Sequence, residues 1–332
     1  MNALITGGAG FIGSYLSEEL LKRGDKVYVI DNLSTGNFNN IKHLLTDEKF
    51  KFIQGNILDR YLTERYVKET DIIYHLAAAV GVKYIMEKTL ESIQTNVHGT
   101  EIILELASKW KKKVMLASTS EVYGKNGSVP YKEDGDRLMG ATTTIRWSYS
   151  CTKALDEFMA LAYFKEQGLP IVIVRFFNTC GPRQTGQYGM VIPRFVRAAL
   201  LDKPVVVYGD GTQTRCFTYV GDAVKAVTAL METEKSIGEI FNVGSTQEIQ
   251  IRELAQKIIK LTGSSSKIEY ISYEEAYGKS FEDMKRRLPD ISKIQNLIEW
   301  QPEVDMDELL QKVIAYEETV NLSLQHITGS RL

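Results

Sequence analysis

The N-terminal 31 residues place the strongest constraint on the fold. Residues 2–6 form a short apolar run of the kind that makes a buried parallel strand. Three glycines then follow at intervals of three residues: Gly7, Gly10 and Gly13. Residues 14–23 have helical periodicity with Gly24 as the stop, and residues 26–30 predict a second strand that ends on Asp31. This order predicts a parallel β-α-β unit.

Such a unit is typical of dinucleotide-binding (Rossmann) folds. The glycines allow a pyrophosphate to approach the backbone, and the N-terminus of the following helix offers free N–H groups and a positive dipole end. Asp31, 18 residues beyond Gly13, would accept hydrogen bonds from the adenosine ribose hydroxyls. Its carboxylate would also repel a 2′-phosphate, so the sequence predicts NAD rather than NADP.

Further β/α alternation extends the predicted cofactor site. Residues 50–53 predict a strand that leads into Gly55-Asn56-Ile57, a candidate wall for the adenine. Residues 71–76 predict another strand, and the small residues 77–79 behind it would let a cofactor pass or would simply allow tight helix–strand packing. The residues of this half predicted to contact NAD are Gly7, Gly10, Phe11, Ile12, Gly13, Asp31, Asn32, Asn56, Ile57, Leu76, Ala77 and Ala78.

Composition argues against several other classes of protein. The 332 residues, 44% hydrophobic and 25% charged, suggest one large globular domain or two closely packed ones. The net charge of −2 argues against a nucleic-acid surface. The three cysteines and four histidines show no metal-ligand spacing and no disulfide framework. No apolar run reaches the roughly 18 residues of a membrane span and no signal peptide precedes the first strand, so we expect a cytoplasmic, metal-free protein that binds no membrane.

Hydroxyl groups and a carboxylate follow the strand predicted over residues 114–117. The segment is Ser118-Thr119-Ser120-Glu121-Val122-Tyr123-Gly124. Ligands of open α/β sheets bind at the carboxyl ends of the strands, so this segment is a candidate for catalysis. The alternative is a polar loop with a surface glutamate.

A tyrosine and a lysine four residues apart form the second candidate. Tyr149 and Lys153 would lie on one face of a helix, about one turn apart. An ammonium group beside a phenol favours the phenolate, which lowers a tyrosine pKa that is ordinarily about 10. Such a tyrosine can take a proton from a sugar hydroxyl. The spacing alone also occurs by chance on exposed helices.

Together these motifs resemble the extended short-chain dehydrogenase/reductase family, and more narrowly its nucleotide-sugar epimerases, dehydratases and decarboxylases. The resemblance covers nearly the whole chain. It implies an α/β fold: a Rossmann doubly wound parallel sheet with a smaller C-terminal α/β substrate-binding domain. Residues 1–175 would mainly bind NAD and residues 176–325 would mainly bind the nucleotide-sugar, with some elements returning to the first domain.

The family's site residues carry over by position. Those implied at the reacting centre are Tyr149, Lys153, Ser118, Thr119, Glu121 and Arg215. Tyr149 would be the base, while Lys153 would lower its pKa and hold the nicotinamide ribose. Substrate contacts are implied for Tyr84, Ser120, Asn178, Val191, Tyr208, Arg215 and Arg287. Arg286 and Arg287 are alternatives for the contact with the diphosphate, because guanidinium groups bind phosphates in bidentate geometry.

Members of the family share a first step, in which NAD takes hydride from C4 while the tyrosine takes the O4 proton. Return of the hydride to the other face gives a 4-epimer. Elimination of the 6-hydroxyl gives a dehydratase product and needs an acid for the leaving group. A uronic acid can instead lose CO₂, because a ketone at C4 makes C6 a β-keto acid. NAD would stay tightly bound and be regenerated in each cycle.

Three features favour decarboxylation. Ser120 stands where dehydratases carry an Asp, and a serine hydroxyl is a poor acid. Glu121 is kept, whereas plain epimerases usually lack it. The segments 145–148 and 215–217 resemble decarboxylases, although the loop 184–190 departs from their pattern. We therefore expect conversion of UDP-glucuronic acid to UDP-xylose or its 4-keto product, with a UDP-sugar 4-epimerase as the alternative. A 4,6-dehydratase, a non-catalytic NAD-binding protein and a ketoreductase that releases its cofactor are less favoured.

The resemblance also implies a homodimer. Its interface would be a two-helix face, with apolar stripes from the helices that begin near Glu91 and Ser150.

Overall fold

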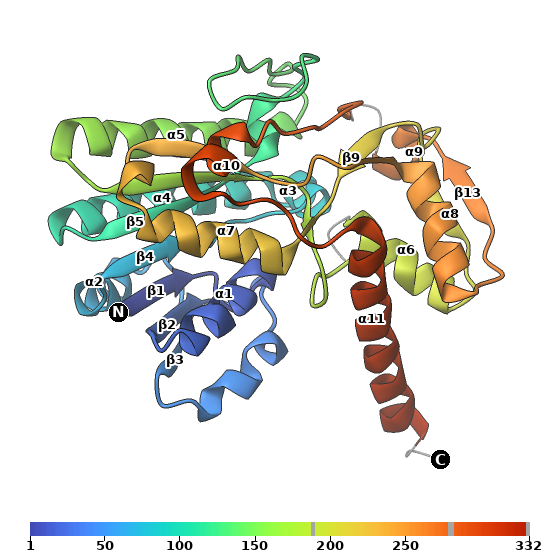
Figure 1. Ribbon diagram of the computed structural model, residues 1–332, viewed down its shortest axis with the longest axis horizontal. Helices are drawn as coiled ribbons and strands as arrows, with labels where there is room; N and C mark the ends of the chain where they lie inside the picture. Colours follow the sequence, from blue (N-terminus) through green and yellow to red (C-terminus); the bar gives the residue numbers. More distant parts are fainter. Residues whose placement is uncertain (187–189, 278–281, 330–332) are drawn as a thin grey trace.

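A seven-stranded parallel sheet forms the centre of the larger domain (Figure 1). The computed structural model describes residues 1–186, 190–277 and 282–329, except for the side chains of 82, 83 and 321–329. The strand order is β3-β2-β1-β4-β5-β6-β11. These strands are β1 (Asn2–Thr6), β2 (Lys26–Asp31), β3 (Phe50–Gln54), β4 (Ile72–His75), β5 (Lys113–Thr119), β6 (Ile171–Phe176) and β11 (Glu239–Val243).

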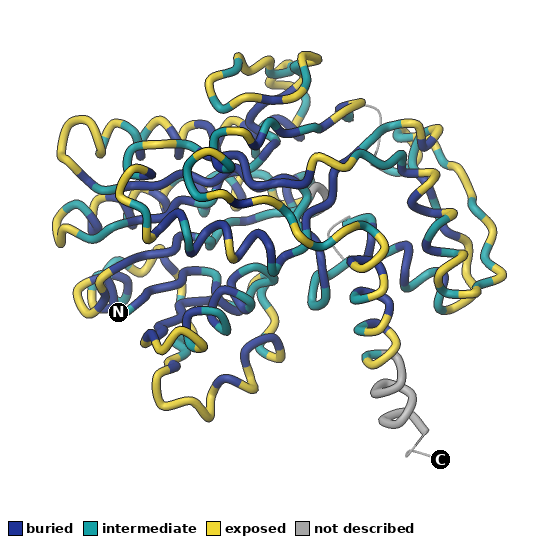
Figure 2. Tube along the Cα trace, viewed as in Figure 1, coloured by how far each residue is buried: buried dark blue, intermediate teal, exposed yellow. Residues whose placement is uncertain are grey.

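Helices cover both faces of this sheet, as the buried apolar strands require. One face packs against α1 (Phe11–Lys22), α7 (Val220–Glu232) and α10 (Ser292–Ile298). The other packs against α2 (Arg60–Glu69), α4 (Thr89–Lys109) and α5 (Trp147–Gln167), and α3 (Val82–Glu87) precedes α4. Figure 2 shows the resulting band of buried residues through the sheet. The predicted α/β alternation is thereby confirmed, and β11, α7 and α10 from beyond residue 175 belong to this domain.

A smaller cluster of elements lies beside the carboxyl ends of the strands (Figure 1). Its core joins α6 (Val191–Leu200), α8 (Ile251–Thr262) and the first half of α11 (Met306–Gly329). Short paired strands complete it: β8 (Val205–Tyr208) with β13 (Ile268–Ile271), β9 (Thr214–Cys216) with β12 (Glu248–Gln250), and β7 (Thr179–Cys180) with β10 (Thr218–Tyr219). The remaining helical turns are α9 (Tyr273–Tyr277), η1 (Phe38–Asn40), η2 (Lys42–Thr46), η3 (Ser120–Tyr123) and η4 (Glu234–Ser236).

Candidate active site

One large pocket lies between the strand ends of the sheet and the smaller cluster, with a volume of about 690 Å³. Every residue predicted to contact NAD lines it, and so does every residue predicted for the reacting centre and the substrate. The loop 184–190 contributes Gln184, Thr185 and Met190 to the lining, while residues 187–189 lie outside the described residues. The roles of these side chains remain predictions, but their convergence on one pocket is a property of the structure.

The glycine turn is shaped for close approach to its own backbone and to a ligand. Gly7 has φ 73°, and a Cβ there would lie 2.8 Å from the backbone nitrogen of Ala77. A Cβ on Gly13 would lie 2.5 Å from the carbonyl oxygen of Gly7. Gly10 is the N-cap of α1, so the free N–H groups of that helix point to the pocket. Such a turn fits the pyrophosphate of a dinucleotide.

Asp31 ends β2 beside this turn. Its carboxylate accepts hydrogen bonds from the backbone N–H groups of Ala9 (3.0 Å) and Leu33 (2.8 Å). Burial raises the pKa of Asp31 above its ordinary value, although these backbone donors oppose the shift. The carboxylate therefore fixes the glycine turn as well as offering an acceptor to a ribose.

Tyr149 lies one helical turn before Lys153 on α5, and Thr119 hydrogen-bonds to its hydroxyl group. The other predicted hydroxyl, that of Ser118, instead donates to Glu157. Of the two, Thr119 is thus the one placed against Tyr149.

The expected effect of Lys153 on Tyr149 is outweighed by other groups around the phenol. Burial raises the pKa of Tyr149, and the negative charges of Glu121 and Asp156 raise it further. Lys153 Nζ lies 2.9 Å from Asp156 Oδ2, so its charge is largely balanced by a carboxylate. The prediction of a lowered tyrosine pKa is therefore wrong, because desolvation and two anions outweigh one paired cation.

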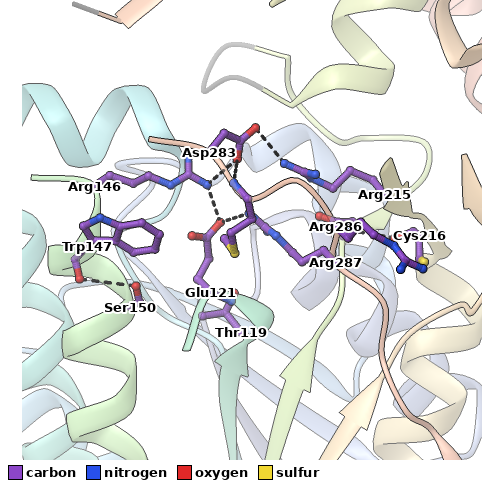
Figure 3. A network of polar contacts seen from close by, with 12 residues as sticks. Thr119, Glu121, Arg146, Trp147, Ser150, Arg215, Cys216, Asp283, Arg286 and Arg287 are labelled. Carbon is purple, nitrogen blue, oxygen red and sulfur yellow. Dashed lines mark hydrogen bonds and ion pairs between the residues drawn. The ribbon is translucent and has the colours of Figure 1, made fainter. Parts of the chain in front are cut away.

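Charged side chains from separate parts of the chain meet above Thr119 (Figure 3). Glu121 Oε1 lies 2.7 Å from Arg287 and 3.4 Å from Arg146. Asp283 lies 3.2 Å from Arg146 and 2.8 Å from Arg215, and it also accepts a hydrogen bond from Tyr273. We call these five charged residues the arginine–carboxylate cluster: Glu121, Arg146, Arg215, Asp283 and Arg287.

The cluster keeps its carboxylates ionised. Burial alone would raise the pKa of Glu121, but Arg287 and Arg146 outweigh it and hold that pKa below its ordinary value. Burial is likewise outweighed at Asp283, where Arg215 and Arg146 hold the pKa low. Three guanidinium groups face these two carboxylates, so the cluster carries a net positive charge suited to an anionic ligand.

The remaining predicted contacts surround this cluster. Of the two arginines predicted as alternatives, Arg287 is buried and lines the pocket, whereas Arg286 is exposed and pairs with Glu248, so position favours Arg287 and its contact with the diphosphate stays a prediction. Asn178 is fixed by donation to the Cys216 carbonyl (3.0 Å). Val191 is the first residue of α6, and Tyr208 is the last residue of β8, where the guanidinium group of Arg194 lies over its ring. The Tyr84 hydroxyl donates a hydrogen bond to Glu91 (2.9 Å).

Sequence reasoning missed three members of the site: Arg146, Asp283 and Tyr273. Arg146 lies in the lead-in 145–148, which was noted only for its resemblance to decarboxylases. Asp283 precedes the basic run that holds Arg287, and no local pattern distinguishes it from a surface acid. Their pairing depends on contacts across the fold, which spacing along the chain does not show.

Two further properties concern the described part of the chain. Within it, no group of three or more His, Cys, Asp or Glu side chains could hold a metal ion. Among its helices, none is both long enough and apolar enough to cross a membrane.

Comparison with known proteins agrees with this geometry. The family model described as GDP-mannose 4,6 dehydratase matches residues 4–313. A UDP-N-acetyl-alpha-D-glucosaminuronate decarboxylase from Bacillus cytotoxicus is 50% identical over 94% of this chain and 96% of its own length. UDP-glucuronic acid decarboxylase 1 from Xenopus tropicalis is 37% identical over 94% of this chain and 71% of its own.

Solved structures give the same result. UDP-glucuronic acid 4-epimerase from Bacillus cereus, determined with UDP-glucuronic acid and NAD, is 32% identical and superposes with a TM-score of 0.87 over 96% of this chain and all of that one. The relatives match both the expected decarboxylase and its epimerase alternative, and they confirm the Rossmann fold and NAD as the cofactor. The chain belongs to the GDP-mannose 4,6 dehydratase family, within the extended short-chain dehydrogenase/reductases that act on nucleotide-sugars with NAD.

Proposed function

We propose that this protein decarboxylates a UDP-linked hexuronic acid through a 4-keto intermediate. The observation that carries the proposal is the position of Glu121 between the guanidinium groups of Arg287 (2.7 Å) and Arg146 (3.4 Å), whose charges hold its pKa below the ordinary value. An ionised carboxylate cannot protonate a departing hydroxide, and the adjacent Ser120 is no better an acid, which disfavours 4,6-dehydration. Decarboxylation needs no such acid, because a C4 ketone already activates the C6 carboxylate for loss.

The chain's own residues supply the rest of the reaction. NAD, which the glycine turn, Asp31 and Lys153 would hold, would supply the hydride chemistry at C4. Tyr149 takes the O4 proton, and its hydrogen bond with Thr119 fixes the orientation of the phenol. The arginines of the arginine–carboxylate cluster bind the anionic groups of the nucleotide-sugar, so that the sugar carboxylate and the diphosphate replace Glu121 and Asp283 as their partners.

The names of the relatives narrow the choice of sugar substrate. The relative at 50% identity is named for a 2-acetamido uronic acid, whereas those named for glucuronic acid are at 37% or less. We infer that UDP-N-acetylglucosaminuronate is turned over faster than UDP-glucuronic acid. Each would be incubated with the protein and NAD and its products followed by NMR. A UDP-linked pentose with release of CO₂ supports the proposal.

A 4-epimerase is the second candidate, favoured by the close superposition on the Bacillus cereus epimerase. It would give the C4 epimer of the uronic acid with the carboxylate retained. Formation of that epimer with no CO₂ from either substrate would overturn the decarboxylase proposal.

We propose that the protein is a homodimer through α5. Cys151, Leu155 and Phe158 are exposed and lie at helical spacing on one face of this helix. The exposed fraction of the Phe158 side chain is 60%, which is unusual for an aromatic residue unless another surface covers it. Sedimentation analysis should give a dimer, and Phe158→Asp should give a monomer. A wild-type monomer at micromolar concentration would contradict this assignment.

A further inference from the structure

A chain of buried polar side chains connects Lys153 to the turn that receives NAD. Its members are Lys153 on α5, Asp156 on α5, Thr100 on α4, His75 on β4 and Thr6 on β1. Each of them is at most 3% exposed. Buried polar groups are costly unless hydrogen-bonded, so a chain of five needs a continuous set of partners.

Asp156 is the charged centre of this chain. Its Oδ2 accepts a hydrogen bond from Lys153 Nζ at 2.9 Å, its Oδ1 has no hydrogen-bond partner among the described residues, and the nearby Thr100 hydroxyl favours the charged form of the carboxyl group. Asp156 lies one turn after Lys153, so helix α5 itself holds the two groups together. The ion pair is desolvated, and removal of one partner would leave an uncompensated charge.

His75 fixes the direction of the hydrogen bonds. Burial and the charge of Lys153 lower its pKa to about 3, so the imidazole is neutral and carries one proton. The Thr100 hydroxyl stabilises the charged carboxyl group of Asp156, so its proton is directed there and its oxygen accepts from His75 Nε2, which lies 3.2 Å away. His75 Nδ1 must then accept from the Thr6 hydroxyl at 2.7 Å, and Thr6 Oγ1 accepts from the backbone N–H of Ala77 at 3.2 Å.

The far end of the chain is therefore the backbone that touches the glycine turn. Ala77 lines the pocket, and its nitrogen is the atom that a Cβ on Gly7 would meet. Lys153 lines the same pocket. The hydrogen bonds from Ala77 through Thr6 and His75 to Thr100 all run toward Asp156, and Lys153 donates to Asp156 from the other end, so these groups link the lysine to the cofactor turn.

We propose that Asp156 is a positioning residue, which anchors Lys153 and supplies the negative charge that balances Lys153 and a bound oxidised nicotinamide. This rests on the proposed function only in that Tyr149 and Lys153 carry out a hydride-transfer reaction. Asp156 has no assigned role in that reaction, yet it is the anion nearest to Lys153 in the described structure.

The other carboxylates near Tyr149 and Lys153 are paired with arginines. Glu121 of η3 also acts on Tyr149, but it belongs to the arginine–carboxylate cluster and is paired with Arg287. Glu157 lies beside Asp156 and is neutralised by the Arg175 guanidinium group at 2.7 Å. Asp156 is therefore the carboxylate whose charge acts on Lys153 and Tyr149 without an arginine partner of its own among the ion pairs described.

The test compares NAD⁺ with NADH. In Asp156→Asn the full-length protein should lose affinity for NAD⁺ by at least about threefold more than for NADH, since only the oxidised ring is cationic. Calorimetric titration measures this ratio without turnover, so its result does not depend on which sugar is the substrate. The charge of Asp156 raises the pKa of Tyr149, so its removal should lower that pKa. In the pH–rate profile of Asp156→Asn, the limb that reports the tyrosine base should therefore move by about half a pH unit or more toward lower pH.

Two control variants separate charge from structure. Asp156→Glu keeps the charge and should keep the wild-type affinity ratio and pH limb. Asp222→Asn removes a comparably buried carboxylate on α7, which accepts from the backbone of Glu303 and Val304, and should lower the melting temperature alone. Equal losses of NAD⁺ and NADH affinity in Asp156→Asn, with an unmoved pH limb, would overturn the proposal.

A milder substitution in the same chain of side chains keeps the proposal testable if Asp156→Asn does not fold. Thr100→Val breaks the hydrogen-bond chain without altering a formal charge, so the rate should fall while the NAD⁺/NADH ratio is kept. If Asp156→Asn and Asp156→Ser both fail to fold while Asp222→Asn folds, Asp156 is a folding element and the proposal is wrong.

Discussion

The two halves of the pocket are built in different ways. The cofactor half consists of backbone: a glycine turn, the N-terminus of α1 and a carboxylate held by backbone N–H groups. The sugar half consists of long charged side chains from η3, the start of α5, β9 and the segment 283–287, shown together in Figure 3. The first is formed mainly by one stretch of sequence, and the second by segments spread along the chain, with Glu121 and Arg287 166 residues apart.

This difference predicts different sensitivities. A backbone site tolerates changes of charge but not of volume, because its shape is set by atoms that cannot move independently. A site made of ion pairs tolerates changes of volume better than loss of one partner, because an unpaired buried charge is costly. Substitutions in each half should therefore affect the binding of one ligand and spare the other.

The largest effect is expected for Gly13→Ala. The added Cβ would lie 2.5 Å from the Gly7 carbonyl oxygen, so the turn must shift. NAD affinity should fall at least about 100-fold and the free energy of unfolding by about 2–3 kcal/mol. Calorimetry and thermal unfolding would measure both. Gly127→Ala is the matched control, since its Cβ would meet nothing within 4 Å. Unchanged NAD affinity in Gly13→Ala would contradict a backbone-built site.

Arg215→Met should disrupt the ion pairs of the sugar half of the pocket. It leaves Asp283 buried with Arg146 as its remaining close guanidinium partner, so we expect a loss of about 2–3 kcal/mol in unfolding free energy and a large rise in KM for the nucleotide-sugar. NAD affinity should stay within about twofold of wild type. Arg286→Met is the control, because that exposed pair contributes less than about 1 kcal/mol. A parallel fall in NAD affinity would mean that the two halves are not separable.

Asp31→Ser tests a charge within the backbone-built half. Serine keeps an acceptor but loses the negative charge, so NAD affinity should fall about tenfold while discrimination against NADP weakens. Titration with both cofactors measures this, with the affinity for the nucleotide-sugar as the internal control. Persistent exclusion of NADP would show that the shape of the turn, and not Asp31, selects the cofactor.

His75→Gln should have the smallest effect, seen only in the pH dependence. The folded pKa of His75 is about 3, below the ordinary value of about 6.5, so the unfolded chain binds the extra proton as the pH falls between these values. This histidine therefore costs the wild-type protein about 0.7 kcal/mol between pH 7 and pH 6. Urea unfolding of His75→Gln should show a smaller loss of unfolding free energy between pH 7 and pH 6 than the wild-type protein shows. Identical slopes would show that the pKa of His75 is the same in the folded protein as in the unfolded chain.

The same contrast explains what could be predicted from sequence. The glycine spacing, Asp31 and the strand–helix alternation are local signals, and the fold and the cofactor half follow from them. Tyr149 and Lys153 are found in the same way, because four residues along a helix bring two side chains to one face.

Prediction failed where a side chain depends on distant partners. Arg146 and Asp283 have no periodic signal, and their positions become meaningful only when β9 and the segment at 283 are brought to the strand tip. The direction of the Tyr149 pKa shift is predicted wrongly for the same reason. In the sequence, Asp156 resembles an ordinary acidic residue on a helix surface, but in the structure it is fully buried.

The pairing of Glu121 and Asp283 with three arginines has a consequence for turnover. The guanidinium groups are already neutralised in part by the protein's own carboxylates. An entering nucleotide-sugar must therefore replace these carboxylates as the partner of the arginines. Affinity should therefore respond to salt less steeply than it would at unpaired arginines. A uronic acid that has lost CO₂ competes with Glu121 and Asp283 for these cations through its diphosphate alone. The protein's own carboxylates then return to their partners, and the product leaves by displacement.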